Sequence, residues 1–200
     1  MKESKNKIKQ ILQNPEAMIR MYAVGAFPMA DSKKKEINWY MPEIRTVIPL
    51  NNYRIPRSLK KFLSNADFTF KYDSNIITVI KSCSERKETW ISDELIKAYS
   101  RMEKLGYVHS VETYFKNKLV GGLYGISYRG AFFGESMFSK IPQASKAALV
   151  KLIEHLNNKN FSLLDVQYTT PHLAMFGAKE ISFTEYAKML ELAYKSDCVF

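Results

Sequence analysis

The sequence has only two cysteines among its 200 residues, Cys83 and Cys198. Two thiols cannot supply a disulfide framework or a zinc quartet, and the three histidines, His109, His155 and His172, are scattered along the chain. We therefore expect no metal site. No histidine lies close in sequence to Cys83 to act as its base, so a cysteine nucleophile is a minor alternative.

The sequence also lacks a run of roughly 18 or more apolar residues, and its N-terminal MKESKNKIKQ has neither the apolar stretch nor the cleavage site of a signal peptide. We expect no membrane contact and a cytoplasmic location. Neither GxxxxGK[ST] nor GxGxxG occurs among the eight glycines. A cradle for nucleotide phosphates is therefore unsupported, and no cofactor is expected.

Acidic residues are in the minority, because 20 of them face 30 basic residues and the formal net charge is +10. Such a balance favours an anionic partner such as a nucleic acid, although it is also common in a Lys-rich proteome. The remaining composition, 46% hydrophobic and 25% charged, is typical of a globular chain that can bury a sizeable core.

Hydrophobic periodicity and capping residues predict alternating helices and strands. We expect helices over residues 15–24, 58–63, 74–83, 93–105, 145–158 and 184–194, with Ser74 and Ser92 as N-caps. We expect strands over residues 68–73, 109–115, 118–128, 130–138 and 161–169. Tight turns at Lys116-Asn117 and Arg129-Gly130 would join three of these strands into a meander.

The domain organisation follows from this pattern. Residues 27–50 contain several prolines and are predicted to form a loop and short extended pieces. The strand over residues 161–169 is apolar on both faces, so we expect it in the centre of the sheet. The sequence thus predicts a small N-terminal subdomain, residues 1–57, followed over residues 58–200 by an α/β or α+β domain with a mixed sheet.

Glycines interrupt the longest predicted strand, where Gly121, Gly122 and Gly125 surround Leu123 and Tyr124. Glycine weakens a strand, so its presence indicates a bulge or a ligand that approaches the backbone closely. Tight packing of a helix against the sheet would explain the same glycines.

Glu135 lies in the segment GESMFS, between the aromatic pair Phe132-Phe133 and the start of a predicted helix. A solvated surface carboxylate is not expected in such a place. Burial of a carboxylate without a partner is costly, so Glu135 could bind an ammonium group. A structural salt bridge is the alternative.

Asp165 and Gln167 stand two residues apart on a predicted strand, so their side chains are expected on one face. A carboxylate accepts hydrogen bonds, and an amide both donates and accepts them. Together they could orient a nucleophile and hold a carbonyl oxygen. A buried hydrogen-bonded pair that only shapes the sheet is an equal alternative.

The segments that contain these residues share one resemblance. YAVGAFPM, NWYMPEIRTVIPL, TWI, GYVHSVE, LVGGLYGISYRGAFFGESMFS, ASKAAL and LLDVQYTTPHLAMFGAKEI resemble, in order and spacing, the signature blocks of the bacterial leucyl/phenylalanyl-tRNA–protein transferases. The resemblance extends from about Met18 to Ile181. GESMFS closely followed by ASK, preceded by GGLYG and followed by D-x-Q, is its most specific part.

The resemblance implies an α+β fold, in which a mixed sheet flanked by helices is similar to acyl-CoA N-acyltransferases (GNAT-like), with a small N-terminal subdomain. It implies no CoA, which agrees with the absence from the sequence of the Q/R-x-x-G-x-G/A loop that binds the CoA pyrophosphate. The implied donors are leucyl- and phenylalanyl-tRNA, and methionine is a further donor amino acid. The implied acceptors are proteins with N-terminal Lys or Arg, which the N-degron (N-end rule) pathway then degrades.

Site residues follow from the same resemblance, position by position. Asp165 and Gln167 match the D-x-Q pair, which implies that they prepare the acceptor amine and stabilise the tetrahedral intermediate. The positions that match the donor pocket and the site of the 3′ adenosine are Trp39, Trp90, Leu123, Phe132, Gly134, Glu135 and Ser136. Trp39 is expected near the terminal adenosine, where an aromatic ring could stack.

The net charge then suggests a set of tRNA phosphate contacts, although surface lysines are usually only solvated. This set is Lys33, Lys34, Lys35, Arg54, Arg57, Lys60 and Lys61. The chain departs from the usual family pattern at Leu123, Phe133, Met175 and Phe183. These departures leave donor and acceptor preference open.

Three alternatives remain at this point. A leucyltransferase that acts on acidic N-termini would share the whole pattern and differ only in its acceptor. A CoA-dependent N-acetyltransferase of the same fold is disfavoured by the missing pyrophosphate loop. A non-catalytic RNA-binding module would explain the charge and the aromatic residues, but it gives Asp165 and Gln167 no role.

Overall fold

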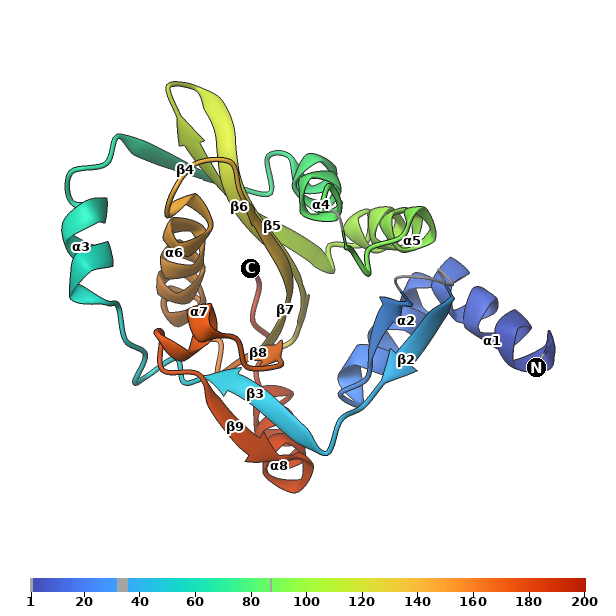
Figure 1. Ribbon diagram of the computed structural model, residues 1–200. Coiled ribbons are helices and arrows are strands. Elements are labelled where there is room, and N and C mark those ends of the chain that lie inside the picture. Colours follow the sequence, from blue (N-terminus) through green and yellow to red (C-terminus); the bar gives the residue numbers. More distant parts are fainter. Residues whose placement is uncertain (1, 32–35, 87) are drawn as a thin grey trace.

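The computed structural model describes residues 2–31, 36–86 and 88–200, with side chains from residue 5 onward. A mixed sheet forms its centre (Figure 1). Its seven strands are β3 (Ile44–Ile48), β4 (Phe68–Tyr72), β5 (Val108–Phe115), β6 (Lys118–Tyr128), β7 (Ala131–Ser139), β8 (Leu163–Gln167) and β9 (Lys179–Ser182). Their order is β4-β5-β6-β7-β8-β3-β9, in which β7 and β8 pair in parallel and the other described neighbours pair antiparallel. The predicted mixed sheet and meander are confirmed.

The turns of the meander form where the sequence predicts them. Lys116 and Asn117 have φ angles of 48° and 62°, and they join β5 to β6 as a two-residue hairpin. Arg129, with φ of 51°, and Gly130 join β6 to β7. The apolar strand β8 lies between β7 and β3, so its predicted central place is confirmed.

Two interpretations of the β6 glycines were open, close packing of a helix and an irregularity of the strand, and each applies at a different glycine. A Cβ atom on Gly121 would lie 2.5 Å from the Cβ atom of Ala144, so this glycine allows a helix to pack directly on the sheet. A Cβ atom on Gly125 would lie 2.4 Å from the Phe132 ring, beside a register shift between Tyr124 and Gly125. The first glycine therefore serves close packing, and the second accommodates an irregularity of the sheet.

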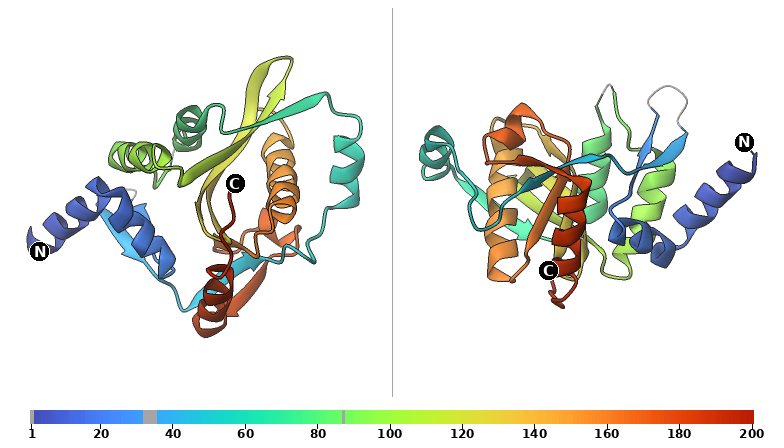
Figure 2. Two further views of the ribbon diagram at one scale, coloured as in Figure 1. Left: turned by 180° about the vertical axis from the view of Figure 1, so that it is seen from behind. Right: turned by 90° about the horizontal axis from the view of Figure 1, so that it is seen from below.

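Helices cover both faces of the sheet. Helix α6 (Ala144–Asn158) lies on one face, while α4 (Ile76–Ser84) and α5 (Asp93–Glu103) lie on the other (Figures 1 and 2). The remaining helices of this part are α3 (Arg57–Leu63), α7 (Pro171–Ala174) and α8 (Phe183–Ala193). None of the helices in the described ranges combines the length and the apolar character that crossing a bilayer requires.

Capping explains one helix start and corrects another. The Ser92 side chain accepts a hydrogen bond from the Leu95 N–H at 3.3 Å, as predicted for the start of α5. The prediction of Ser74 as a cap was wrong, because α4 begins at Ile76 and its N-cap is Asn75. The Asn75 side chain donates to the Tyr114 hydroxyl at 2.9 Å, so a tertiary contact replaces the local cap.

The N-terminal segment contains α1 (Lys2–Gln13), α2 (Pro15–Ala23) and a two-stranded antiparallel sheet of β1 (Phe27–Ala30) and β2 (Ile37–Tyr40). Helices α1 and α2 pack beside α5 (Figure 1). The division into residues 1–57 and 58–200 stays a prediction. Strand β3 belongs to the first of these ranges but is hydrogen-bonded between β8 and β9 in the main sheet.

Candidate active site

An open cleft of about 650 Å³ lies beside the second half of β7 and the end of β8. A narrow apolar pocket of about 80 Å³ opens from it, and we call this the side pocket. The residues that line both are Glu135, Ser136, Met137, Val166, Gln167 and Leu173. The site is thus a wide cleft with a small apolar side chamber, and polar groups stand where the two meet.

The structure brings most of the predicted donor-site residues together here. Leu123 and Gly134 line the side pocket, and Trp90 lines the cleft. Glu135 and Ser136 line both cavities. Residues that sequence analysis did not single out complete the apolar wall of the side pocket, and these include Leu149 and Leu152 of α6 and Leu164 of β8.

Two predicted donor-site residues lie outside both cavities. Phe132 is fully buried and stacks on Phe200 with a ring separation of 5.5 Å. Trp39 meets the edge of the Tyr22 ring at 6.0 Å, and its indole N–H is buried without a hydrogen-bond partner. The N-terminal residues that do line the cleft are Phe27 and Met29 of β1.

Glu135 is held by two tyrosines. The Tyr22 hydroxyl donates to one carboxylate oxygen at 2.8 Å, and the Tyr99 hydroxyl donates to the other at 3.0 Å. Burial raises the pKa of Glu135 to about 7; the two hydrogen bonds act in the opposite direction, the charge of Asp165 adds to the rise and that of Arg45 reduces it. Glu135 therefore changes charge near neutral pH at the junction of cleft and side pocket.

Sequence analysis missed both tyrosines of this cluster. Tyr22 comes from α2 and Tyr99 from α5, so 77 residues separate them, yet their hydroxyl oxygens lie 3.2 Å apart. Burial is the largest cause of the strongly raised pKa of each, so both hydroxyls keep their protons and remain donors. Tyr22 begins the signature block YAVGAFPM, but the block does not indicate this role, and the packing of α2 against α5 brings the two hydroxyls together.

Asp165 is buried with a charge partner that sequence analysis also missed. The Arg45 guanidinium on β3 donates to both carboxylate oxygens, with its shortest contact at 2.6 Å, and both side chains are fully buried. The Tyr186 hydroxyl adds a hydrogen bond at 2.7 Å. The guanidinium carbon of Arg45 also lies 4.5 Å and 4.8 Å from the ring centres of Phe27 and Tyr186. Asp165 lines neither cavity.

Gln167 has a different environment from Asp165, although the two were expected on one face. Its φ angle is +57°, in the left-handed region, and its backbone N–H donates to Asp165 at 2.8 Å. The side chain lines both cavities, and its buried amide nitrogen has no hydrogen-bond partner. A buried amide donor without a partner is costly, so a ligand acceptor in the cleft would satisfy it. The turn at Gln167 breaks the strand alternation on which the sequence prediction relied.

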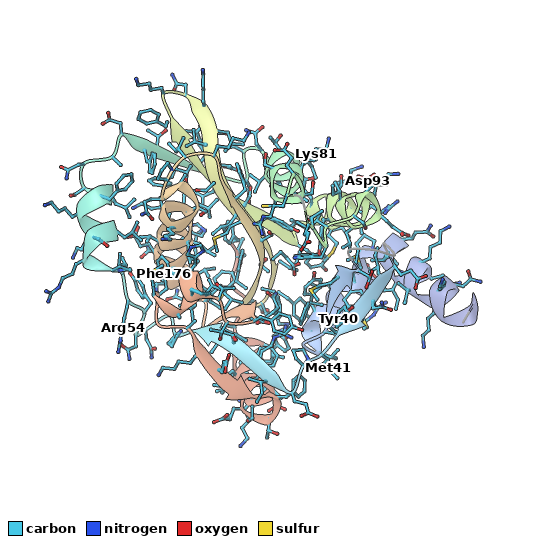
Figure 3. All side chains as sticks on the ribbon, in the orientation of Figure 1. Tyr40, Met41, Arg54, Lys81, Asp93 and Phe176 are labelled. Atoms are coloured by element: carbon cyan, nitrogen blue, oxygen red, sulfur yellow. The ribbon has the colours of Figure 1, made fainter. Side chains whose placement is uncertain are left out.

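The predicted phosphate contacts lie away from the cleft or outside the described residues. Lys33, Lys34 and Lys35 belong to the range that is not described. Arg54, Arg57, Lys60 and Lys61 are exposed on α3 and the segment before it, and none of them lines the cleft. Arg54 lies beside Phe176, which follows α7. Lys81 of α4 and Asp93 of α5 lie on the opposite side of the sheet from Arg54 (Figure 3).

Cysteine and metal chemistry find no support at this site. Burial raises the pKa of the Cys83 thiol to about 12, so the group stays protonated at neutral pH. Across the ranges that the structure describes, no three side chains of His, Cys, Asp or Glu gather closely enough to hold a metal ion.

Several solved structures are similar to this chain to different degrees. FemX matches with a TM-score of 0.55 and 10% sequence identity over 84% of this chain and 66% of its own length. A functionally unknown conserved protein from Staphylococcus epidermidis ATCC 12228 matches with 0.43 and 10% over 84% and 64%. An aminoglycoside acetyltransferase from an uncultured soil metagenomic sample matches with 0.37 and 14% over 73% and 88%. The chain spans just under two thirds of the length of the first two proteins.

The match to FemX agrees with the predicted GNAT-like α+β fold, which is confirmed. At a sequence identity this low, structural similarity shows a shared fold and gives no information about function. Sequence comparison is more specific, because the model of the leucyl/phenylalanyl-tRNA protein transferases matches residues 47–191. This range includes the side pocket, Glu135, Asp165 and Gln167. The chain therefore belongs to the leucyl/phenylalanyl-tRNA protein transferase family, a family of aminoacyltransferases.

Proposed function

We propose that the protein transfers leucine or phenylalanine, and also methionine, from aminoacyl-tRNA to the α-amino group of proteins with N-terminal Lys or Arg. The family assignment supports tRNA-dependent aminoacylation of protein N-termini and a role in N-end rule degradation. A cytoplasmic location, where charged tRNA and acceptor proteins meet, is part of this proposal.

The observation that carries the proposal is the apolar side pocket, which meets the cleft at Glu135 and Gln167. An apolar donor side chain would fill the pocket, where Leu123, Leu149 and Leu164 offer hydrophobic contact. The donor's α-ammonium group would then face the Glu135 carboxylate. Its ester carbonyl would come near the unpartnered amide of Gln167.

The reaction asks little of the protein beyond placing these groups, because an aminoacyl ester is already activated. The neutral acceptor amine attacks the ester carbonyl carbon, so a C–N bond forms and a tetrahedral intermediate carries negative charge on oxygen. The Gln167 amide would donate a hydrogen bond to that oxygen. The C–O bond to the ribose then breaks, and the proton lost by the amine ends on the released tRNA hydroxyl.

Asp165 takes a supporting role in this proposal. Its oxygens are occupied by Arg45, Tyr186 and the Gln167 backbone, so it has no route to a substrate amine. Through its bond to the Gln167 N–H it would hold that residue in the left-handed conformation which directs the amide to the cleft. We therefore propose Gln167 as the group that touches the reacting atoms and Asp165 as the residue that positions it.

Part of the remaining predicted contact set fits the same scheme, whereas Trp39, which was expected near the adenosine, lines neither cavity. Trp90 lines the cleft and could stack on the terminal adenosine, a contact worth about 1–3 kcal/mol. Arg54, Arg57, Lys60 and Lys61 remain proposed contacts to the body of the tRNA, because their exposed charges lie on a separate surface at α3.

A leucyltransferase for acidic N-termini is a second candidate, which the basic residues Arg86, Lys140 and His172 of the cleft favour. Glu85 also lines the cleft and would suit a basic acceptor side chain instead. The test is transfer of radiolabelled leucine and phenylalanine from charged tRNA to peptides that begin with Arg, Lys, Asp or Ala, without ATP, CoA or added metal.

Label on the Arg and Lys peptides alone is the expected result. Label on the Asp peptide would replace the proposed acceptor class with the acidic one. Label on no peptide would contradict the transferase function.

A further inference from the structure

The cleft has a basic wall that has no role in the reaction proposed for Lys and Arg acceptors. Arg86 follows α4, Lys140 follows β7, and both side chains are exposed and line the cleft. Within the described ranges, no carboxylate forms an ion pair with either residue. We call Arg86 and Lys140 the basic wall.

Arg86 is held in place against β7. Its guanidinium group donates to the Met137 carbonyl oxygen and to the Ser136 hydroxyl, the latter at 3.4 Å. Ser136 and Met137 also line the side pocket, so the guanidinium stands next to the mouth of the proposed donor site. A guanidinium group carries five N–H donors in a planar fork, so these contacts leave others free for a phosphate.

Lys140 extends the basic wall just past the end of β7. Its ammonium group lies 5.8 Å from the centre of the Phe138 ring. From Glu135 to Lys140 the backbone advances five residues, which corresponds to about 16 Å at the rise of an extended strand. The basic wall therefore begins beside the proposed binding point of the donor's α-amino group, with Arg86 at Ser136 and Met137, and continues to Lys140 just past the end of β7.

From this arrangement we infer that Arg86 and Lys140 bind the terminal phosphodiesters of the donor, so that its single-stranded 3′ end runs along β7 from Glu135 toward Lys140. This inference rests on the proposed function and adds the path of the donor. A basic acceptor terminus would be repelled by the same wall, so the acceptor enters from another side of the cleft.

Three donors that differ in phosphate content test the inference. They are the leucyl ester of adenosine, which has no phosphate, the leucyl ester of the dinucleotide CpA, which has one phosphodiester, and leucyl-tRNA. The variants are Arg86→Gln and Lys140→Gln, and Lys195→Gln is the matched control, because it removes one exposed positive charge outside the cleft.

We expect at least one of the two cleft variants to raise KM about tenfold for the CpA ester, and both to do so for leucyl-tRNA. The KM of leucyl-adenosine and every kcat should stay at the level of the control. For leucyl-tRNA, the slope of log KM against log salt should fall by about 0.7 for each lost phosphate contact.

An equal rise in KM for leucyl-adenosine would overturn the inference, because Arg86 would then only support the pocket through Ser136 and Met137. Unchanged KM values for the CpA ester and leucyl-tRNA would overturn it as well. So would a higher KM confined to an acidic acceptor peptide, which would assign the wall to the acceptor. If the unaltered protein transfers leucine from none of the donors, the proposed function fails, whereas a failure of the inference alone leaves that transfer intact.

Discussion

Two carboxylates lie in the middle of neighbouring strands of one sheet, but their surroundings differ. Asp165 on β8 meets a guanidinium group, a tyrosine hydroxyl and a backbone N–H, and it contacts no cavity. Glu135 on β7 meets two tyrosine hydroxyls and opens onto both cavities. The two carboxylates thus differ in charge compensation: a cation inside the protein neutralises Asp165, whereas Glu135 is partly buried and has no such partner at the place where we propose that the donor binds.

The physical reason is the cost of a buried charge. The guanidinium group of Arg45 compensates Asp165 inside the protein, so no ligand is needed. Glu135 has only neutral donors within hydrogen-bond distance, and burial raises its pKa to about 7. An incoming ammonium group would supply the missing positive charge. Four predictions test this difference in charge compensation between Asp165 and Glu135.

The largest effect is expected from Arg45→Met, which leaves Asp165 as an uncompensated buried carboxylate. The free energy of unfolding should fall by about 3–5 kcal/mol, as measured by urea denaturation. The double variant Arg45→Met/Asp165→Leu should regain much of this loss, because no buried charge remains. A stability loss in Arg45→Met below about 1 kcal/mol would show that the pair is not a critical part of the fold.

Gln167→Ala should lower kcat by about 10²–10³-fold and leave the donor KM nearly unchanged, because it removes a donor that acts on the developing oxyanion. Steady-state kinetics with leucyl-tRNA and an Arg peptide measure both constants. Asp165→Asn serves as the comparison, since it should weaken catalysis only as far as it loosens Gln167. A rise in KM with an unaltered kcat would place Gln167 in ground-state binding instead.

The third prediction concerns the pH dependence of donor binding. The Glu135 carboxylate is ionised above its pKa of about 7 and becomes neutral below it, so affinity for the donor ammonium should fall as pH decreases. The α-amino group of a non-reactive amide analogue of leucyl-adenosine stays mostly protonated up to pH 7, so its Kd at pH 6 should be about fivefold higher than at pH 7.

Glu135→Gln should bind this analogue weakly at both pH values. An analogue that lacks the α-amino group should show no dependence around pH 7 in the unaltered protein. A pH dependence that persists in Glu135→Gln would assign the titration to another group.

Tyr99→Phe is expected to have the smallest effect. It removes a hydrogen bond that favours the ionised form of Glu135, so the pKa of Glu135 should rise and the pH profile of donor binding should shift upward. At pH 7 the Kd of the analogue should increase a few-fold, by the usual strength of a hydrogen bond to a charged group. Tyr128→Phe, at a partly buried tyrosine that does not line the cleft, is the matched control. An unshifted profile in Tyr99→Phe would show that Tyr22 alone holds the carboxylate.

Local sequence rules predicted those parts of the site that depend on one segment. The strand-turn-strand order that places Leu123, Gly134 and Glu135 near each other follows from two short hairpins, and both formed as expected. Strand alternation did not indicate that Asp165 and Gln167 have different surroundings, because it assumes extended φ angles and Gln167 has left-handed backbone geometry. The direct roles of Trp39 and Phe132 stay predictions; in the structure the first packs on Tyr22 and the second on Phe200.

The sequence by itself determined the family, the order of strands and helices around the site, and the segment that contains most of the proposed donor pocket. These properties rest on hydrophobic periodicity, turn residues and contiguous motifs, all of which act over short stretches of chain. Only the tertiary structure decided that Arg45 neutralises Asp165 and that Tyr22 and Tyr99 hold Glu135. Those contacts join residues 36 to 120 positions apart, and the ionisation of a buried group depends on whichever neighbours the fold brings to it.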